Sequence, residues 1–235
     1  MDLQDRVVLV TGAVGNLGRA VAREVVAAGG RVCAIDRDEA ALASAYADEL
    51  AAGRATVRAA DVLDPASMDA ALAAATAAFG GSLDGVVATV GAWKGGAPFA
   101  SGGWSDWEAM LSLNLRSAVV TLRAAIDRMP RGGSLVTIAS LAGTRAAPGE
   151  SAYGAAKAGV VHLTETLAVE LKERGIRANA ILPGTLDTPQ NRAWMDESAR
   201  ATAIGLDAVA RVARFLLSDA SAPVTGSLLR ATGRQ

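Results

Sequence analysis

Val7-Val-Leu-Val-Thr11-Gly-Ala-Val-Gly-Asn-Leu-Gly18 is the segment that most strongly predicts the architecture of this chain. A short apolar run is followed directly by a glycine-rich segment, and a helical pattern begins at about residue 16. Glycines at such a place permit a tight turn and let backbone amides approach a pyrophosphate closely, while the N-terminus of the following helix adds positive potential. The order of strand, glycine turn and helix therefore predicts a dinucleotide-binding unit, and a purely structural turn is the alternative.

The same alternation of short apolar runs and longer Ala-rich segments continues along the chain. The strands are expected at 7–10, 31–35, 55–59, 83–89, 134–139, 177–182 and 227–231, and the helices at about 16–29, 38–52, 66–79, 105–129, 152–173 and 206–218. The strands lack a clean polar alternation, as expected when both faces of a sheet are covered. The pattern predicts the α/β class, with one domain over residues 1–235: a doubly wound Rossmann fold whose parallel sheet has about seven strands.

Composition and charge exclude several classes of partner. The formal net charge is −1 and there is no basic tract, so nucleic acid and anionic membrane are not expected partners. Cys33 is the only cysteine and His162 the only histidine, so neither a disulfide framework nor a metal site is expected. The first residues do not resemble a signal peptide, and no apolar run looks long enough to span a bilayer. A cytoplasmic location is therefore expected.

Tyr153 and Lys157 are the strongest candidates for chemistry. They are four positions apart and therefore share one face of the predicted helix, thirteen positions after Ser140. A nearby ammonium should lower the pKa of the phenol from its usual value of about 10, so that it can act as general acid or base on a carbonyl or alcohol. Ser140 closes a strand-like run and could donate a hydrogen bond to the same oxygen.

Asp36, at the end of the second predicted strand, bears on the choice of cofactor. A carboxylate there can accept both hydroxyls of an adenosine ribose and would repel a 2′-phosphate, which favours NAD(H). Arg37 keeps NADP(H) open, because its guanidinium could turn to that phosphate. In the alternative interpretation, Asp36 only caps the following helix. Asp61 and Val62 follow the third strand and could bind the adenine edge.

Together these residues closely resemble the classical short-chain dehydrogenase/reductases over nearly the whole chain. Thr11, Gly12 and Gly18 match the nucleotide motif Thr-Gly-x-x-x-Gly-x-Gly, in which Asn16 replaces the middle glycine and Gly15 precedes it. Asn tolerates the left-handed conformation better than most residues, so we expect the turn to be kept.

Other segments carry the resemblance further. The family's Asn-Asn-Ala-Gly reads Ala88-Thr-Val-Gly91 here, so Thr89 is expected to take over part of the bracing of the central strand. The resemblance implies a catalytic set of Asn114, Ser140, Tyr153 and Lys157. It implies a cofactor site made of Gly12, Gly15, Asn16, Leu17, Gly18, Asp36, Arg37, Asp61, Val62, Thr89, Gly91, Tyr153, Lys157, Pro183, Gly184 and Thr188.

The activity that the resemblance implies is hydride transfer between a nicotinamide cofactor and a small carbonyl or secondary alcohol. Tyr153 would transfer the proton, Lys157 would bind the nicotinamide ribose, and Asn114 would hold a water in a proton relay. A homo-oligomer, either a dimer or a tetramer, is also implied. Residues 182–192 resemble those of dihydropteridine reductases, which is the second hypothesis. A dinucleotide sensor without catalysis is the third.

Four tryptophans flank the two least regular stretches, 91–104 and 184–205. Trp93, Trp104, Trp107 and Trp194 could form a flat apolar substrate pocket, or they could dock helices, notably Trp104 and Trp107. Lys94 could meet an anionic substrate, although solvation is the simpler interpretation.

Overall fold

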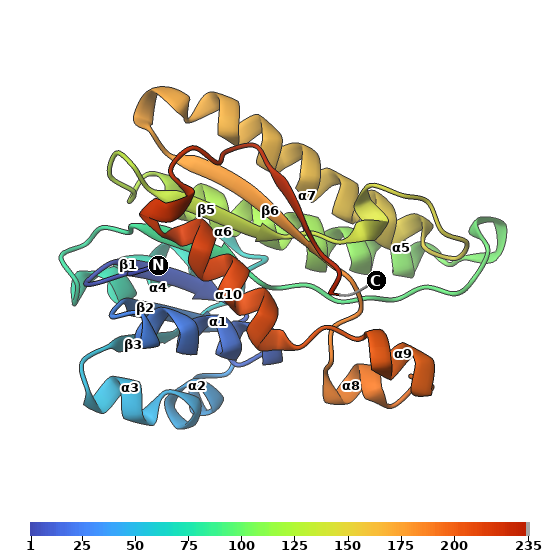
Figure 1. The fold of residues 1–235 in the computed structure, drawn as a ribbon, viewed down its shortest axis with the longest axis horizontal. Helices are drawn as coiled ribbons and strands as arrows, with labels where there is room; N and C mark the ends of the chain where they lie inside the picture. The colour runs from blue at the N-terminus through green and yellow to red at the C-terminus, as the bar shows by residue number, and fades with distance from the viewer. Residues whose placement is uncertain (234–235) are drawn as a thin grey trace.

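Strand β1 (Val7–Thr11) is buried along its whole length. It is an inner strand of the sheet in this computed structural model, which describes residues 1–233 (Figure 1). The other strands are β2 (Arg31–Asp36), β3 (Ala55–Ala59), β4 (Gly85–Ala88), β5 (Ser134–Ile138), β6 (Arg177–Pro183) and β7 (Leu228–Ala231). All pairings are parallel and the strand order is β3-β2-β1-β4-β5-β6-β7. The predicted doubly wound sheet is thus confirmed; residues 234 and 235 of the predicted domain lie outside the described range.

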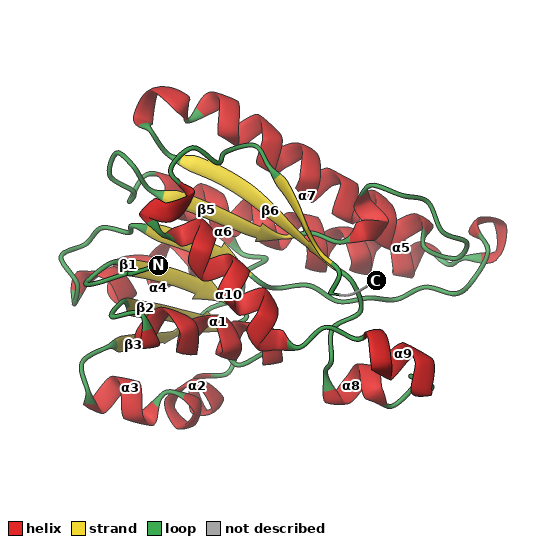
Figure 2. Cartoon of the chain, viewed as in Figure 1, coloured by secondary structure: helices red, strands yellow, loops and turns green. Residues whose placement is uncertain are grey.

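Helices cover both faces of the sheet (Figure 2). The α-helices are α1 (Asn16–Ala27), α2 (Glu39–Ala45), α3 (Ala47–Ala51), α4 (Pro65–Ala77), α5 (Trp104–Met110), α6 (Ser117–Ile126), α7 (Ser151–Glu170), α8 (Pro189–Arg192), α9 (Glu197–Thr202) and α10 (Leu206–Leu217). A π-helical turn, η2 (Leu111–Arg116), joins α5 to α6, and short 3₁₀ turns are η1 (Phe99–Ser101), η3 (Leu141–Gly143), η4 (Lys172–Arg174) and η5 (Asp219–Ser221).

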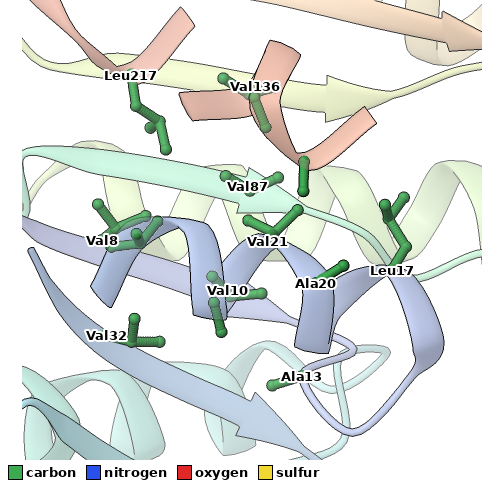
Figure 3. Packing of buried hydrophobic residues seen from close by; sticks show 14 of the residues in the cluster. Val8, Val10, Ala13, Leu17, Ala20, Val21, Val32, Val87, Val136 and Leu217 are labelled. Atoms are coloured by element: carbon green, nitrogen blue, oxygen red, sulfur yellow. The ribbon is translucent and has the colours of Figure 1, made fainter. Parts of the chain in front are cut away.

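Alternate residues of β1 enter two different cores. Val8 and Val10 pack with α1 and α10 on one face (Figure 3), whereas Val7 and Leu9 pack with α4 and α6 on the other. Burying an aliphatic side chain of this size contributes about 1.5–3 kcal/mol, so both layers hold β1 firmly. The strand order reverses between β1 and β4, and in such sheets the crevice at the carboxyl ends of these two strands binds the ligand.

Two predicted helices differ from the structure. The helix expected over 38–52 breaks at Tyr46, whose φ of −116° and ψ of 20° separate α2 from α3. The helix expected over 105–129 contains the π-helical turn η2 and ends at Ile126. The two stretches expected to be irregular contain η1, α8 and α9.

Residues Trp104–Ile126 form one continuous helix that is long and apolar enough, by length and composition, to cross a membrane. The prediction that no run is long enough is therefore wrong by this criterion. Half of the apolar window is buried within the fold, and core helices of globular proteins pass the same test.

Candidate active site

The turn after β1 is closely packed, and glycines occupy its tightest positions. Gly12 has a φ of +66°, in the left-handed region that favours glycine, and Gly15 is the N-cap of α1. A Cβ on Gly18 would lie 2.2 Å from the carbonyl oxygen of Gly12, so α1 can approach the turn only without a side chain there. Leu17, the residue before Gly18 in α1, is buried in the core. These features fit a pyrophosphate at the N-terminus of α1.

Asn16 occupies a different conformation from the expected one. It is the first residue of α1, and Asp5 is the only non-glycine residue with a positive φ among residues 1–233. The expectation of a left-handed asparagine is therefore wrong, because the turn places its left-handed residue at Gly12. The side-chain Nδ2 of Asn16 instead donates a hydrogen bond to Oε1 of Gln190 at 3.0 Å, which links the turn to α8.

Asp36 lies at the end of β2 and holds the same turn. Its Oδ2 accepts the amide of Val14 at 3.0 Å, and its Oδ1 accepts the amide of Arg37 at 2.8 Å. The interpretation of Asp36 as a helix cap is wrong, because Asp38 is the N-cap of α2. The side chain of Arg37 is exposed beside this carboxylate.

Asp61 and Val62 follow β3, as predicted. Oδ1 of Asp61 accepts the amide of Leu63 at 2.8 Å, and Val62 is half-buried against the core. The site of an adenine edge at these two residues stays a prediction.

Thr89 and Gly91 connect the end of β4 to the rest of the site. Oγ1 of Thr89 donates to the carbonyl of Thr11 at 2.7 Å, which is the bracing of β1 expected of it. A Cβ on Gly91 would lie 2.8 Å from Oδ1 of Asn114 and 3.1 Å from Nζ of Lys157. Glycine at this position therefore lets the chain pass close to both polar side chains.

Asn114 lies in the π-helical turn and is almost fully buried. Its Oδ1 accepts the amide of Ala92 at 3.2 Å, and its Nδ2 donates to the carbonyl of Ala92 at 2.9 Å and to that of Met110 at 3.0 Å. Asn114 thus fixes the backbone of the loop after β4. π-Helical turns are frequent at functional sites.

Ser140, Tyr153 and Lys157 come together at the carboxyl end of β5. Oγ of Ser140 accepts the amide of Ala142 at 3.2 Å and caps η3, and Tyr153 and Lys157 lie in α7. Lys157 is 4% exposed, and its Nζ donates to the carbonyl of Ile138 at 2.9 Å. Nζ lies 5.8 Å from the ring centroid of Tyr153.

The pKa of Tyr153 differs from the sequence expectation. Burial of the phenol raises its pKa, the hydrogen bond with Ser140 lowers it, and the charge of Glu150 raises it again. The prediction that Lys157 lowers this pKa is therefore wrong, because Nζ is directed to the carbonyl of Ile138. Tyr153 therefore keeps its proton at neutral pH.

Burial lowers the pKa of Lys157 to about 8, from 10.5 in an exposed side chain. Between these two pH values the unfolded chain binds more protons than the folded chain, so the folded state gains stability as the pH rises. The wild type should therefore gain about 1–3 kcal/mol in free energy of unfolding relative to Lys157→Met between pH 7.5 and pH 10.5. Urea denaturation at both pH values measures this difference, and an unchanged difference would contradict it.

Pro183, Gly184 and Thr188 follow β6 at the same end of the sheet. Pro183 is the last residue of β6, and the amide of Gly184 donates to the carbonyl of Ala231 at 3.0 Å. Oγ1 of Thr188 accepts the amide of Asn191 at 3.1 Å and caps α8. These residues lie at and after the carboxyl end of β6, and their contact with a nicotinamide stays a prediction.

The tryptophans are mostly exposed. Trp93, Trp104 and Trp194 are 57%, 81% and 62% exposed, so the docking interpretation is wrong for Trp104 within this chain. Trp107 makes an edge-to-face contact with Phe99, with 6.1 Å between the ring centroids. This pair anchors the loop before α5.

Two other charged or titratable residues singled out by the sequence lie on the surface. Nζ of Lys94 pairs with Oδ1 of Asp106 at 2.6 Å, so this lysine already has a counterion. His162 is exposed on α7. Within residues 1–233, no group of three or more His, Cys, Asp and Glu side chains could hold a metal ion.

Sequence reasoning missed two residues near the site. Glu150 precedes α7 and raises the pKa of Tyr153, and a lone acidic residue in a loop gave no signal of this. Tyr46 is fully buried and its hydroxyl donates to the carbonyl of Ala13, in the glycine turn, at 2.9 Å. The sequence pattern placed Tyr46 only in the interior of a helix over 38–52, where nothing marked it as part of the site.

Residues 12–233 match the family described as enoyl-(acyl carrier protein) reductase. The chain is 35% identical over 240 residues to cis-4-hydroxycyclohexanecarboxylate dehydrogenase of Sinomonas cyclohexanicum, covering 97% of this chain and 96% of that protein. It superimposes with a TM-score of 0.89 on a short-chain type dehydrogenase/reductase from Mycobacterium ulcerans, at 32% identity, covering 98% of this chain and 89% of that one. The chain belongs to the short-chain dehydrogenase/reductase family.

A second solved structure bears on the cofactor of this short-chain dehydrogenase/reductase. The blue fluorescent protein from a metagenomic library, in complex with NADPH, has a TM-score of 0.88 and 30% identity, and the match covers 99% of both chains. Family membership confirms the predicted class of oxidoreductase. Together with the glycine turn, it supports the binding of a nicotinamide dinucleotide.

Proposed function

We propose that this short-chain dehydrogenase/reductase transfers hydride between a nicotinamide cofactor and a carbonyl or secondary alcohol, with Tyr153 as general acid/base. The observation that carries the proposal is the convergence of Ser140, after β5, with Tyr153 and the buried Lys157 of α7, close to Gly91 after β4. No structural role alone requires a lysine that is 4% exposed at this place, because burying an ammonium is unfavourable.

The chain's own residues position the substrate oxygen and move the proton. A bound nicotinamide supplies hydride to a carbonyl carbon or accepts it from an alcohol. Tyr153, protonated at neutral pH because burial raises its pKa, donates the proton to the substrate oxygen during reduction. The hydroxyl of Ser140 donates a hydrogen bond to the same oxygen. Lys157 binds the nicotinamide ribose, and Asn114 fixes the loop beside it and takes part in the proton relay.

NAD(H) is the favoured cofactor, with NADP(H) as the alternative. The carboxylate of Asp36 is oriented by the amide of Val14, at the end of β2 where an adenosine ribose binds in this fold. Its negative charge disfavours a 2′-phosphate there. Arg37 is exposed next to it, which keeps the alternative open.

Asp36→Asn should remove the repulsion of a 2′-phosphate while it keeps an oxygen for the amide of Val14. We expect the ratio of Kd for NADPH to Kd for NADH to fall about tenfold, the equivalent of one charge interaction near a protein surface. Fluorescence titration with each cofactor measures the ratio. Asp38→Asn is the matched control, since Asp38 is an exposed helix cap two residues away and asparagine also caps helices. An unchanged ratio in Asp36→Asn would count against the role of Asp36.

The substrate class is tested with one panel of compounds. Consumption of NADH and NADPH is followed with ketones, 3-oxoacyl thioesters, quinones and quinonoid dihydropterin, and oxidation is followed with cyclic secondary alcohols. Turnover of a ketone or alcohol supports the proposal. Turnover of the dihydropterin alone supports a dihydropteridine reductase, which residues 182–192 resemble. Tight cofactor binding without any turnover supports the sensor hypothesis.

We also propose a homo-oligomer, a dimer or a tetramer. Leu111 and Val119 on the α5–α6 helix are 38% and 39% exposed, and Val169 on α7 is 75% exposed. Apolar side chains on two neighbouring helices are what a contact between copies would cover. The cytoplasmic location stays a prediction.

A further inference from the structure

One peptide group of the glycine turn is held from both sides. Its carbonyl, from Ala13, accepts the hydroxyl of Tyr46 at 2.9 Å, and its amide, from Val14, donates to Oδ2 of Asp36 at 3.0 Å. The peptide group is planar and rigid. Hydrogen bonds to both its C=O and its N–H therefore fix the orientation of the whole group. The turn between β1 and α1 is therefore set by two side chains far from it in the sequence.

Tyr46 reaches the turn because the helix after β2 breaks at this residue. It lies between the two helices, as the C-cap of α2 and the N-cap of α3, and it is completely buried. The guanidinium of Arg19, in the first turn of α1, lies 4.3 Å from the centroid of the Tyr46 ring. Nη1 of Arg19 is 3.7 Å from Oε1 of Glu49, on α3.

These contacts join three elements into one unit. Arg19 belongs to the helix whose N-terminus faces the expected pyrophosphate, Tyr46 and Glu49 belong to the α2–α3 segment, and Asp36 ends β2. Arg19 and Glu49 have side chains that are 19% and 16% exposed, so little solvent screens their charges. Cation–π contacts of partly desolvated arginines are among the stronger ones.

We propose that Tyr46 is a positioning residue for dinucleotide binding. Its hydroxyl orients the peptide group of residues 13–14, which in turn positions the Asp36 carboxylate. The same peptide group aims the backbone amides that follow it toward the pyrophosphate. Arg19 holds the ring of Tyr46 in place. The proposal rests on the proposed function, because it concerns the same cofactor site. Burial raises the pKa of Tyr46 to about 12, so its hydroxyl stays a donor at every working pH.

Tyr46→Phe removes only the hydroxyl and leaves the carbonyl of Ala13 without its partner. Two readouts are combined: hydrogen exchange of the amides of residues 12–16 in the protein without cofactor, and Kd for NADH by fluorescence titration. We expect exchange at these amides to rise and Kd to increase about threefold to tenfold, the effect of one unsatisfied buried carbonyl that ligand binding must overcome. KM for NADH should rise likewise, with kcat at saturating NADH unchanged.

Thr56→Val is the matched control. Oγ1 of Thr56 donates to the carbonyl of Ala75 at 2.9 Å, so this variant also removes one hydrogen bond from a side chain to a carbonyl, on the neighbouring β3. It should leave both the exchange of residues 12–16 and Kd for NADH within about twofold of wild type, since its loss of stability is remote from the turn.

The outcomes separate this proposal from the proposed function. Unchanged exchange at residues 12–16, or equal effects of Tyr46→Phe and Thr56→Val on Kd, would overturn the role of Tyr46. If the wild type binds neither NADH nor NADPH, the proposed function fails, and faster exchange in Tyr46→Phe would still support the positioning of the turn.

Discussion

Tyr153→Phe is expected to lower kcat about a hundredfold to ten-thousandfold, the usual contribution of a positioned general acid or base. The substitution removes only the hydroxyl, and the ring keeps its packing on α7 beside Lys157. Kd for NADH should therefore stay within about twofold of wild type, since the lost group acts on the substrate oxygen. Steady-state kinetics with the best substrate of the panel, together with fluorescence titration of NADH, measures both quantities.

The chain contains its own control, because Tyr46 is its other tyrosine. The same chemical change, Tyr46→Phe, is expected to raise Kd for NADH and to leave kcat unchanged. Opposite effects at the two positions would separate proton transfer from cofactor binding. If Tyr153→Phe kept more than a few per cent of the wild-type kcat, Tyr153 would not be the general acid/base.

Gly18→Ala should nearly abolish cofactor binding. The new Cβ would lie 2.2 Å from the carbonyl oxygen of Gly12, 2.9 Å from its carbonyl carbon and 3.0 Å from Cα of Ala13. All three neighbours are backbone atoms, so the turn itself must move. We expect Kd for NADH to rise at least about a hundredfold, and the free energy of unfolding to fall by about 1–3 kcal/mol, as for other overpacked positions. NADH titration and urea denaturation measure the two effects.

Gly205→Ala is the matched control for this substitution. A Cβ at Gly205 meets no atom within 4 Å, and its φ of −61° suits any residue. It is the N-cap of α10, where alanine caps less well than glycine, so this variant should lose about 1 kcal/mol in free energy of unfolding but keep the wild-type Kd for NADH. Similar NADH affinities for Gly18→Ala and the wild type would show that the ligand does not bind against this turn.

The strand pattern and the motif residues could be predicted from the sequence for physical reasons. A parallel strand buried on both faces reads as a largely apolar run, and β1 (VVLVT) and β4 (GVVA) have this character. Gly12 and Gly18 were recognisable because their roles need the absence of a side chain, which no other residue offers. Such constraints act within a few residues, where sequence spacing is informative.

Contacts across long sequence separations could not be predicted in this way. The pKa of Tyr153 depends on burial and on the direction of the Lys157 ammonium, which the carbonyl of Ile138, 19 positions earlier, decides. The hydroxyl of Tyr46 donates to the carbonyl of Ala13, 33 positions away, and the helix is interrupted at Tyr46 between α2 and α3. Asn16 was expected in a left-handed conformation, but the turn has its positive φ at Gly12. Which residue of the turn takes this conformation depends on three-dimensional packing.

The π-helical turn that carries Asn114 has a consequence for how this chain can change. Successive residues of an α-helix advance by 100°, so one added residue rotates everything beyond it by that angle. The wide turn η2 takes up such a rotation between α5 and α6. Helix α5 follows the loop of residues 91–103, and α6 packs on the sheet. Mutation can therefore remodel the loop and α5 while α6 keeps its register in the core.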